Sequence, residues 1–458
     1  MLRIIATTCV LGLLASPTAM AGQADLILVG AKVLTGDSNR PAAEAVALAG
    51  ERIRAVGPSA EIRRLAGPRT RVVDLRGRTV IAGLIDAHVH LLGAPAIVDE
   101  PSLRTFERTA LPKIMIGFIS HGITTVRSTG DPLPYIAQLR DRLERGQLVG
   151  PRLLITGPVL SSPGGHPATT VCRDNPFCRQ GSAREIESEE QARQVVRELS
   201  RAKVDAVKVV VDDVIRKVPA LSDAVISALV DETHRTGLRI IAHVSVTKDV
   251  ATARGLLELG LDEFVHIPIN DLGAWGPQFG RAPNPAEVSQ IAGMLVARNV
   301  PVTTTVSGGD AYRDTTGVER SFFGGNAPYT PAMRQRLEWG LNIVRGFADA
   351  GVKLVVGTDW SLRPPVLDDP RIQPGALTLH EMELLHRAGL PTPAILTAAT
   401  RNGAEALGII DKVGTIAEGK LADLVVLDGD FLQDFSALHR TVAVLKGGRV
   451  VHGTLPER

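Results

Sequence analysis

Cysteine is scarce in this chain: its 458 residues include only Cys9, Cys172 and Cys178. So few cysteines exclude a scaffold held by several disulfides, and they make a thiolate metal site unexpected. Cys172 and Cys178 stand six positions apart in CRDNPFC. This spacing suits a disulfide that closes a small loop in an oxidising compartment, and two free thiols are the alternative.

An excess of charge of either sign is also missing. The chain has 51 Lys and Arg against 49 Asp and Glu, and it contains no basic cluster. Neither nucleic acid nor an anionic membrane surface is therefore expected as a partner. Beyond residue 21 no apolar run is long enough for a membrane-spanning helix. We expect a small-molecule substrate, and assembly into a homo-oligomer stays open.

Residues 1–21 have the pattern of a secretory signal peptide. Arg3 supplies the positive start, residues 4–15 form a short apolar core, and Ala19-Met20-Ala21 is a small-x-small cleavage motif. We therefore expect a periplasmic or secreted protein, and an uncleaved membrane anchor is the alternative.

From residue 79 the chain alternates short β-branched runs with amphipathic helical stretches. The runs that predict strands are 79–87, 122–129, 151–160, 205–211, 238–244, 263–269, 299–306 and 353–359. Helical patterns lie between them, for example at 133–147, 188–203, 221–236, 284–298 and 331–350. Eight such units indicate an α/β fold, a (β/α)8 TIM barrel over residues 79–408, with a doubly wound open sheet as the alternative.

The two ends of the chain differ from this middle part. Residues 22–78 and 409–458 both contain short strand patterns separated by turns. The simplest arrangement is one small β-sandwich domain built from both ends, with the barrel inserted between its two parts.

Two histidines stand where the first barrel strand is expected to end. In GLIDAHVH, His88 and His90 are separated by one residue and therefore share a face of the strand. Two imidazoles at a strand end can bind one divalent cation. An isolated HxH pair is, however, also found as solvated or core histidines.

Four further polar residues fall at matching places on other strands. Lys208 lies inside VKVVV and faces away from its valine neighbours, toward the barrel interior, where an unpaired lysine is unfavourable. His243 ends IIAHV, His266 lies in FVHIPI, and Asp359 ends VVGTD. Because active sites of such barrels form at the carboxyl ends of the strands, we expect one metal site. Its predicted ligands are His88, His90, Lys208, His243, His266 and Asp359.

These motifs resemble those of the amidohydrolase superfamily. GLIDAHVH, the inward Lys208, the later strand histidines and GTDW match its pattern, as do TAATRNGAEALG and GTIAEGKLADLVVLD near the end of the chain. The similarity covers essentially the whole chain after residue 21. It points to the imidazolonepropionase-like branch, which includes metal-dependent prolidases and Xaa-Arg/Lys dipeptidases.

The resemblance implies a centre with two divalent cations. His88, His90 and Asp359 would hold one cation, His243 and His266 the second, and a carbamylated Lys208 would bridge them. Desolvation lets the lysine amine lose its proton and take up carbon dioxide, and the resulting anion has two oxygens to offer. Zinc is the default for such nitrogen and oxygen ligands, with manganese or cobalt as alternatives.

The expected activity is hydrolysis of an amide bond in a dipeptide or an N-acyl amino acid. A water bridging the two metals would attack the carbonyl, while Asp359 accepts its proton and passes it to the leaving amine. The alternatives are a cyclic amidohydrolase or deaminase, a lactone or organophosphate ester hydrolase, and a non-catalytic binding protein. Deaminases of the superfamily typically carry HxxE after strand five, whereas HVSV here has no glutamate.

Aromatic residues make up only 3% of the chain, yet half of them fall in the long loops after strands three, six, seven and eight. This placement favours an aromatic substrate pocket that includes Tyr312 and Trp360, although such residues also pack long loops. His166, in SSPGGHP, is a candidate contact for the carbonyl oxygen or a substrate carboxylate, or else a histidine packed under a turn. Arg127 would bind substrate or pair with a neighbouring acid.

Overall fold

The computed structural model describes residues 23–92, 97–211, 218–244, 250–267, 282, 284–313, 319–321, 328–361 and 373–457. The expected signal peptide lies outside these ranges. None of the described helices has the length and apolarity needed to cross a membrane.

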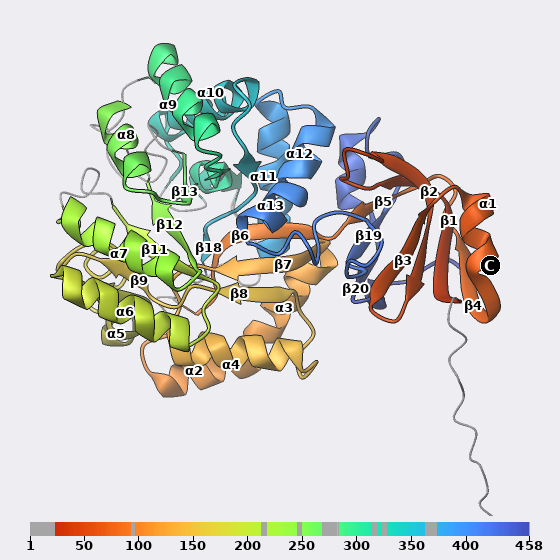
Figure 1. The fold of residues 1–458 in the computed structure, drawn as a ribbon, viewed down its shortest axis with the longest axis horizontal. Helices are drawn as coiled ribbons and strands as arrows, with labels where there is room; N and C mark the ends of the chain where they lie inside the picture. Colours follow the sequence, from red (N-terminus) through yellow and green to blue (C-terminus); the bar gives the residue numbers. More distant parts are fainter. Residues whose placement is uncertain are drawn as a thin grey trace, which may run out of the picture.

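A barrel of parallel strands forms the middle of the chain (Figure 1). Its strands are β6 (Leu84–His90), β7 (Ile123–Ser128), β8 (Arg152–Ile155) with β9 (Val159–Ser161), β11 (Ala206–Val210), β12 (Arg239–His243), β13 (Glu263–Val265), β14 (Val302–Thr303) and β17 (Leu354–Val355). The barrel closes where the Ala87 amide donates to the Val356 carbonyl at 2.9 Å, and where β18 (Trp360–Ser361) pairs with β6. The predicted (β/α)8 architecture is confirmed.

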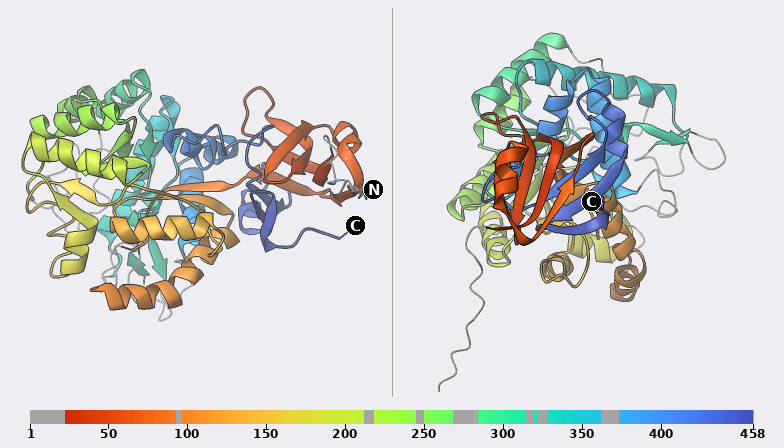
Figure 2. Two further views of the ribbon diagram at one scale, coloured as in Figure 1. Left: turned by 60° about the horizontal axis from the view of Figure 1, so that its bottom comes forward. Right: turned by 90° about the vertical axis from the view of Figure 1, so that its right-hand side faces the viewer.

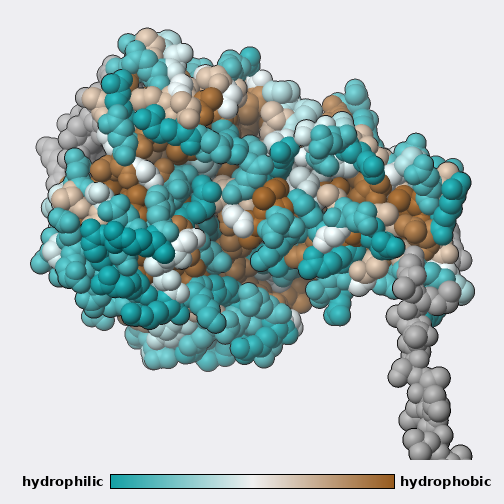
Figure 3. All heavy atoms as spheres, in the orientation of Figure 1, coloured by the Kyte–Doolittle hydropathy of each residue, from teal (hydrophilic) through white to brown (hydrophobic). Residues whose placement is uncertain are grey.

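Helices surround this barrel. They are α2 (Glu100–Thr109), α3 (Leu111–Ser120), α4 (Leu133–Glu144), α5 (Pro176–Ser182), α6 (Glu189–Arg201), α7 (Asp223–Arg235), α8 (Val250–Glu258), α9 (Pro285–Ala297), α10 (Pro331–Asp349), α11 (Pro374–Arg387), α12 (Thr392–Ala398) and α13 (Arg401–Ala406). Helix α6 shows why they form: the Ser188 side chain caps the Gln191 amide, and Ala192, Val195 and Leu199 follow the helical repeat and are buried. The opposite faces of such helices give the largely hydrophilic surface around α4 and α6 in Figure 3.

Two of the predicted strands each divide into two shorter strands. The run 79–87 divides at Gly83 into β5 (Arg78–Ala82), which joins a different sheet, and β6, which continues to His90. A Cβ atom at Gly83 would lie 2.0 Å from Thr124 Oγ1, so only glycine permits this close approach. The run 151–160 likewise divides at Gly157, whose φ is +71°. A continuous apolar run does not reveal where a strand changes its partners.

Strands from both ends of the chain form a second sheet beside the barrel (Figure 2). Its order is β21-β20-β19-β5-β1-β2-β3, with β4 paired to β1. The bounds are β1 (Ala24–Leu34), β2 (Ala42–Ala49), β3 (Arg52–Gly57), β4 (Ala66–Asp74), β19 (Leu424–Asp428), β20 (Thr441–Lys446) and β21 (Arg449–Gly453). All eight strands join one sheet, so the predicted two-sheet sandwich is not confirmed. Strand β5 extends past the predicted domain boundary at residue 78, and the domain limits stay a proposal.

Short elements complete the described chain. They are α1 (Ser59–Ile62), β10 (Ala183–Glu185), the antiparallel pair β15 (Ala311–Arg313) and β16 (Glu319–Ser321), and the 3-10 turns η1 (Arg63–Leu65), η2 (Val306–Gly309) and η5 (Phe435–His439). Of these, η2 follows barrel strand β14 directly and helps to shape the candidate site.

Candidate metal centre

The end of β6 brings two histidines to one carboxylate. His88 and His90 alternate with Val89, so both imidazoles lie on the same side of the strand. The distance from His88 Nε2 to Asp359 Oδ1 is 3.1 Å, and that from His90 Nε2 to the same oxygen is 2.9 Å. The Asp359 amide also donates to the His88 carbonyl at 2.8 Å, which holds the end of the eighth strand against the first.

Two more histidines lie beside this group. His88, His266 and Asp359 each offer a donor atom within 4.8 Å of the others, a spacing that a metal ion can span. The His266 ring centroid is 5.1 Å from that of His88 and 4.4 Å from that of His243. The four predicted histidine ligands and Asp359 thus form one connected group, with the histidines at the carboxyl ends of β6, β12 and β13. Their roles as metal ligands stay a prediction.

Lys208 is the unusual member of the group. It lies on β11 opposite Ile241 of β12, and its side chain is 2% exposed. Within the described part of the chain its Nζ has no hydrogen-bond partner. Burial lowers the pKa of the Lys208 amine to about 7, although the charge of Asp359 acts in the opposite direction. A buried amine that is partly neutral at pH 7, next to a cluster of imidazoles, fits a lysine that becomes a metal-binding carbamate.

The protonation states of the cluster also suit a cation. Burial lowers the pKa of His88 well below its usual value, and the neighbouring Lys208 adds to this effect. Burial raises the pKa of Asp359, but the hydrogen bonds from His88 and His90 outweigh it and lower that pKa well below the usual value. A neutral imidazole and an ionised carboxylate are the forms that bind metal.

Backbone strain is concentrated at the same place. His266, Thr305 and Asp359 have φ values of +73°, +50° and +55°, a region that non-glycine residues rarely adopt. His266 Nδ1 lies 2.8 Å from Thr305 Oγ1, which orients the ring so that Nε2 lies on its other side. Strain of this kind persists where the surroundings hold it and is typical of functional sites.

Two buried acids hold these strained segments, and the sequence reasoning missed both. Glu381 of α11 accepts hydrogen bonds from the Val306 amide at 3.0 Å and the Ser307 amide at 2.6 Å, just after Thr305. Asp86 accepts from Thr358 Oγ1 at 2.8 Å, just before Asp359. The sequence signal for Asp86 is its position in an otherwise apolar run, because a carboxylate that is buried there needs hydrogen-bond partners.

Arg127 does not lie where a substrate would contact it, which corrects the substrate-binding prediction. Its side chain is 1% exposed, and its NH1 donates to Glu263 Oε2 at 3.0 Å, with Glu263 fully buried. Its Nε donates to the Ala87 carbonyl at 2.9 Å. Of the two alternatives left by the sequence, the structure favours the pairing with an acid.

Trp360, which was expected to line an aromatic substrate pocket, is instead buried against a helix. Its side chain is 4% exposed and its ring meets that of Phe118 on α3 edge to face, with centroids 6.1 Å apart. The indole therefore packs against helix α3. Tyr312 lies on β15, paired with Arg320, and its side chain is outside the described part of the structure.

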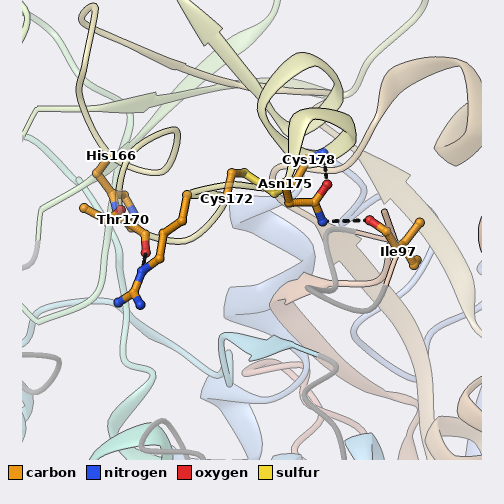
Figure 4. Close-up of a disulfide and its surroundings, with 7 residues drawn as sticks. Ile97, His166, Thr170, Cys172, Asn175 and Cys178 are labelled. Carbon is orange, nitrogen blue, oxygen red and sulfur yellow. Dashed lines mark hydrogen bonds between the residues drawn. A yellow bond between two sulfur atoms is a disulfide. The ribbon is translucent and has the colours of Figure 1, made fainter. Parts of the chain in front are cut away.

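His166 lies beside the cluster, on the loop that follows β9. Its ring centroid is 5.0 Å from that of His243, and its Nδ1 is 2.6 Å from Thr170 Oγ1. Farther along the same loop a disulfide joins Cys172 to Cys178 (Figure 4). The loop thus carries an imidazole to the edge of the candidate centre.

Comparison with known proteins agrees with this geometry. The model of the amidohydrolase family matches residues 79–451. An imidazolonepropionase of Symbiobacterium thermophilum is 28% identical over 439 residues, covering 88% of this chain and 91% of that protein. An N-substituted formamide deformylase of Arthrobacter pascens is 36% identical over 96 residues, and this chain spans only 18% of its length.

A solved structure shares the fold. A Xaa-Pro dipeptidase with bound methionine in its active site has a TM-score of 0.70 and 20% identity, covering 93% of this chain and all of that one. The family model extends over most of the chain and includes the candidate centre. The chain belongs to the amidohydrolase family and is a metal-dependent hydrolase that acts on carbon–nitrogen bonds.

Proposed function

We propose that this enzyme hydrolyses the amide bond of a dipeptide or an N-acyl amino acid at a centre of two divalent cations. The observation that supports this most strongly is the buried Lys208 amine, which has no partner among the described residues and adjoins the histidine cluster. An unmodified lysine would repel cations there, whereas its carbamate is an anion with two oxygens.

The ligands divide into two sets. His88, His90 and Asp359 would hold one cation, His243 and His266 the other, and the Lys208 carbamate both, with zinc the expected metal. Such cations lower the pKa of a water and polarise a substrate carbonyl. The carbamate forms when the lysine nitrogen bonds to carbon dioxide and releases one proton to solvent.

Side chains of the site would transfer the proton of the attacking water. Asp359 is ionised, about one quarter exposed, and held between His88 and His90, so its carboxylate can accept a proton from the attacking water. It would deliver that proton to the amide nitrogen as the carbon–nitrogen bond breaks. His166, next to His243, would donate a hydrogen bond to the substrate carbonyl oxygen, where negative charge develops.

The resemblance of 88% of the chain to an imidazolonepropionase supports a second candidate, hydrolysis of a cyclic amide. The two candidates use the same proton transfer and differ in whether the leaving nitrogen stays attached to the product. Release of a free amine identifies the first, and ring opening without amine release identifies the second.

Metal content tests the two-cation centre. We expect about two zinc ions per chain in the wild type and about one or fewer in Lys208→Ala, because the bridging anion is lost. Lys113→Ala, at an exposed position of α3, is the matched control and should bind as the wild type does. Elemental analysis after dialysis gives the stoichiometry. A single ion that is unaffected by Lys208→Ala contradicts the proposal.

A substrate panel tests the reaction. Dipeptides and N-acyl amino acids are compared with cyclic amides, lactones and organophosphate esters, and amine release is measured for the first two classes. We expect hydrolysis of dipeptides or N-acyl amino acids in the wild type and a loss of about 10³-fold or more in Asp359→Asn, which lacks the proton acceptor. Hydrolysis of lactones or esters alone contradicts amide cleavage.

Export is part of the proposal. The pattern of residues 1–21 supports cleavage after Ala21 and a periplasmic or secreted enzyme. Sequencing the amino terminus of protein recovered from the periplasm or the medium of an expressing bacterium should find Gly22 first. Recovery of the chain only in the cytoplasm, with Met1 retained, contradicts export.

A further inference from the structure

The loop that carries His166 is organised around one carbonyl group. The Pro167 carbonyl accepts hydrogen bonds from the Val171 amide at 2.9 Å and the Cys172 amide at 3.0 Å. Thr169 Oγ1 donates to the Gly164 carbonyl at 2.8 Å. These bonds fold residues 164–172 into a tight turn, so His166 and Thr170 come together although four positions separate them.

Thr170 contacts the imidazole that faces the metal centre. Its Oγ1 is 2.6 Å from His166 Nδ1, so this nitrogen is engaged by the threonine hydroxyl. Of the two ring nitrogens, a hydrogen bond at one decides which protonation state and which orientation the other presents. With Nδ1 held by Thr170, Nε2 is the nitrogen on the side of the ring opposite to that hydroxyl.

The disulfide joins this turn to a helix that is fixed elsewhere. Cys172 and Cys178 are both buried, and Cys178 lies in α5. At the start of α5 the Asn175 side chain accepts from the Cys178 amide at 3.1 Å and donates to the Ile97 carbonyl at 2.8 Å (Figure 4). Asn175 lies within the loop that the disulfide closes, so its hydrogen bond to Ile97 connects this loop to the segment that follows β6, the strand of His88 and His90.

Helix α5 has further contacts with the barrel. The Phe177 ring lies 5.9 Å from that of Tyr135 on α4. Gly181 approaches the loop after β7 so closely that a Cβ atom there would lie 2.9 Å from Pro132. A helix held at these points is a firm anchor for the bond to Cys172.

We propose that Thr170 is a positioning residue for His166, and that the Cys172–Cys178 disulfide holds the turn on which both residues lie. The inference rests on the proposed function, in which His166 contacts the substrate carbonyl oxygen. Thr170 sets the orientation of the ring, and the disulfide keeps the turn at the edge of the centre. Together they pre-organise a contact that strengthens as charge develops on the oxygen.

Variants of Thr170 test the first part. Thr170→Val keeps the shape but removes the hydroxyl, and we expect kcat to fall about 10–100-fold while KM changes less than about threefold. Thr170→Ser should restore most of the rate. The matched control is Thr397→Val, which removes a hydroxyl that donates to the Pro393 carbonyl on α12, away from this loop. It should keep kcat within about threefold of the wild type.

A double-mutant cycle separates positioning from general loosening of the loop. In a His166→Ala background Thr170→Val should change kcat less than about twofold, since the hydroxyl acts only through the ring. Bound metal and melting temperature should match those of the wild type in both single variants. An undiminished loss from Thr170→Val in the His166→Ala background, or full activity in Thr170→Val, overturns the assignment.

Hydrogen exchange tests the disulfide without any substrate. In Cys172→Ser/Cys178→Ser we expect amides in peptides from residues 164–175 to exchange about tenfold faster, with β11 and β12 unchanged. If circular dichroism shows that this variant does not fold, the comparison uses folded wild type before and after a phosphine reductant. Unchanged exchange in the loop overturns this part.

The two proposals fail in different ways. If exchange in the loop depends on the disulfide but no amide in the panel is hydrolysed, the proposed function fails and the structural role of the disulfide stands. If amides are hydrolysed but kcat does not respond to Thr170→Val, the proposed function stands and the positioning role fails.

Discussion

At the scale of single residues, the pair of Arg127 and Glu263 shows how the barrel interior supports the site. Both side chains are almost completely buried, and Glu263 also accepts from Thr303 Oγ1 at 2.7 Å. The two charges shift the pKa of the Lys208 amine in opposite directions: Arg127 lowers it and Glu263 raises it. The pair therefore adds little net charge beneath the site while filling the barrel with satisfied polar groups.

Removing one partner of this pair should destabilise the protein strongly. Arg127→Met leaves Glu263 buried without its cation, and we expect the free energy of unfolding to fall by about 3–5 kcal/mol. The matched control is Arg345→Met, which breaks an exposed pair with Asp349 on α10 and should change it by less than about 1 kcal/mol. Urea denaturation measures both. Similar losses in the two variants would show that the buried pair has no special role.

At the scale of secondary-structure elements, the packing of the eighth strand on the first places Asp359. Just after β17, Gly357 runs so close to its neighbours that a Cβ atom would lie 2.5 Å from Thr303 Cγ2 and 2.9 Å from His88 Cβ. The two strands can approach only because this residue has no side chain. Their closeness lets the Asp359 carboxylate reach both His88 and His90.

Gly357→Ala should therefore disturb the metal centre as well as the fold. We expect a loss of about 1–3 kcal/mol in stability from the overpacked methyl group, together with weaker retention of metal on dialysis. Gly293→Ala on α9 is the matched control, because a Cβ atom there meets nothing within 4 Å. It should be neutral or slightly stabilising in a helix. Full metal retention in Gly357→Ala would contradict the steric argument.

At the scale of the whole molecule, a row of charged groups links the barrel to the C-terminal segment. His380 of α11 has Nε2 3.1 Å from Asp310 Oδ2 and Nδ1 3.2 Å from Glu383 Oε2. Glu383 also lies 2.7 Å from Nε2 of His439, in η5. Nearby, the His386 and Phe435 rings stack with centroids 4.5 Å apart. These contacts join helix α11 of the barrel to the segment that leads into β20.

This row should make stability depend on pH. Burial lowers the pKa of His380, but Asp310 and Glu383 outweigh it and raise that pKa from 6.5 to about 9, with His439 and Arg387 also nearby. A raised pKa stabilises the folded state fully below pH 6.5, and this contribution disappears as pH rises through 9. Relative to His380→Gln, the wild type should therefore lose up to about 3 kcal/mol between pH 6.5 and 9.5.

Melting curves of both proteins across that pH range provide the measurement. The difference between their melting temperatures should shrink as pH rises. A constant difference would mean that His380 does not change its protonation in this range, and that the row contributes by packing alone.

Much of the fold could be predicted because it is encoded locally. The helix expected at 188–203 is α6 at Glu189–Arg201, since a cap and a regular apolar repeat define it without reference to the rest of the chain. The limits of the strands expected at 79–87 and 151–160 cannot be predicted in this way. Each of these runs crosses a glycine at which the chain leaves one partner strand for another. Partner strands are distant in sequence, so a local pattern does not reveal them.

In the candidate site, too, some features follow from the local sequence and others depend on distant segments. The sequence by itself determined which residues stand at the ends of parallel strands, and parity placed His88, His90 and Lys208 toward the interior. Only the tertiary structure decided that Arg127 pairs with Glu263, that Trp360 packs on Phe118, and that Asp86 and Glu381 hold the strained turns. Alternation along a strand is a local property of the backbone. Which charges meet, and which ring is covered, depends on segments that only folding brings together.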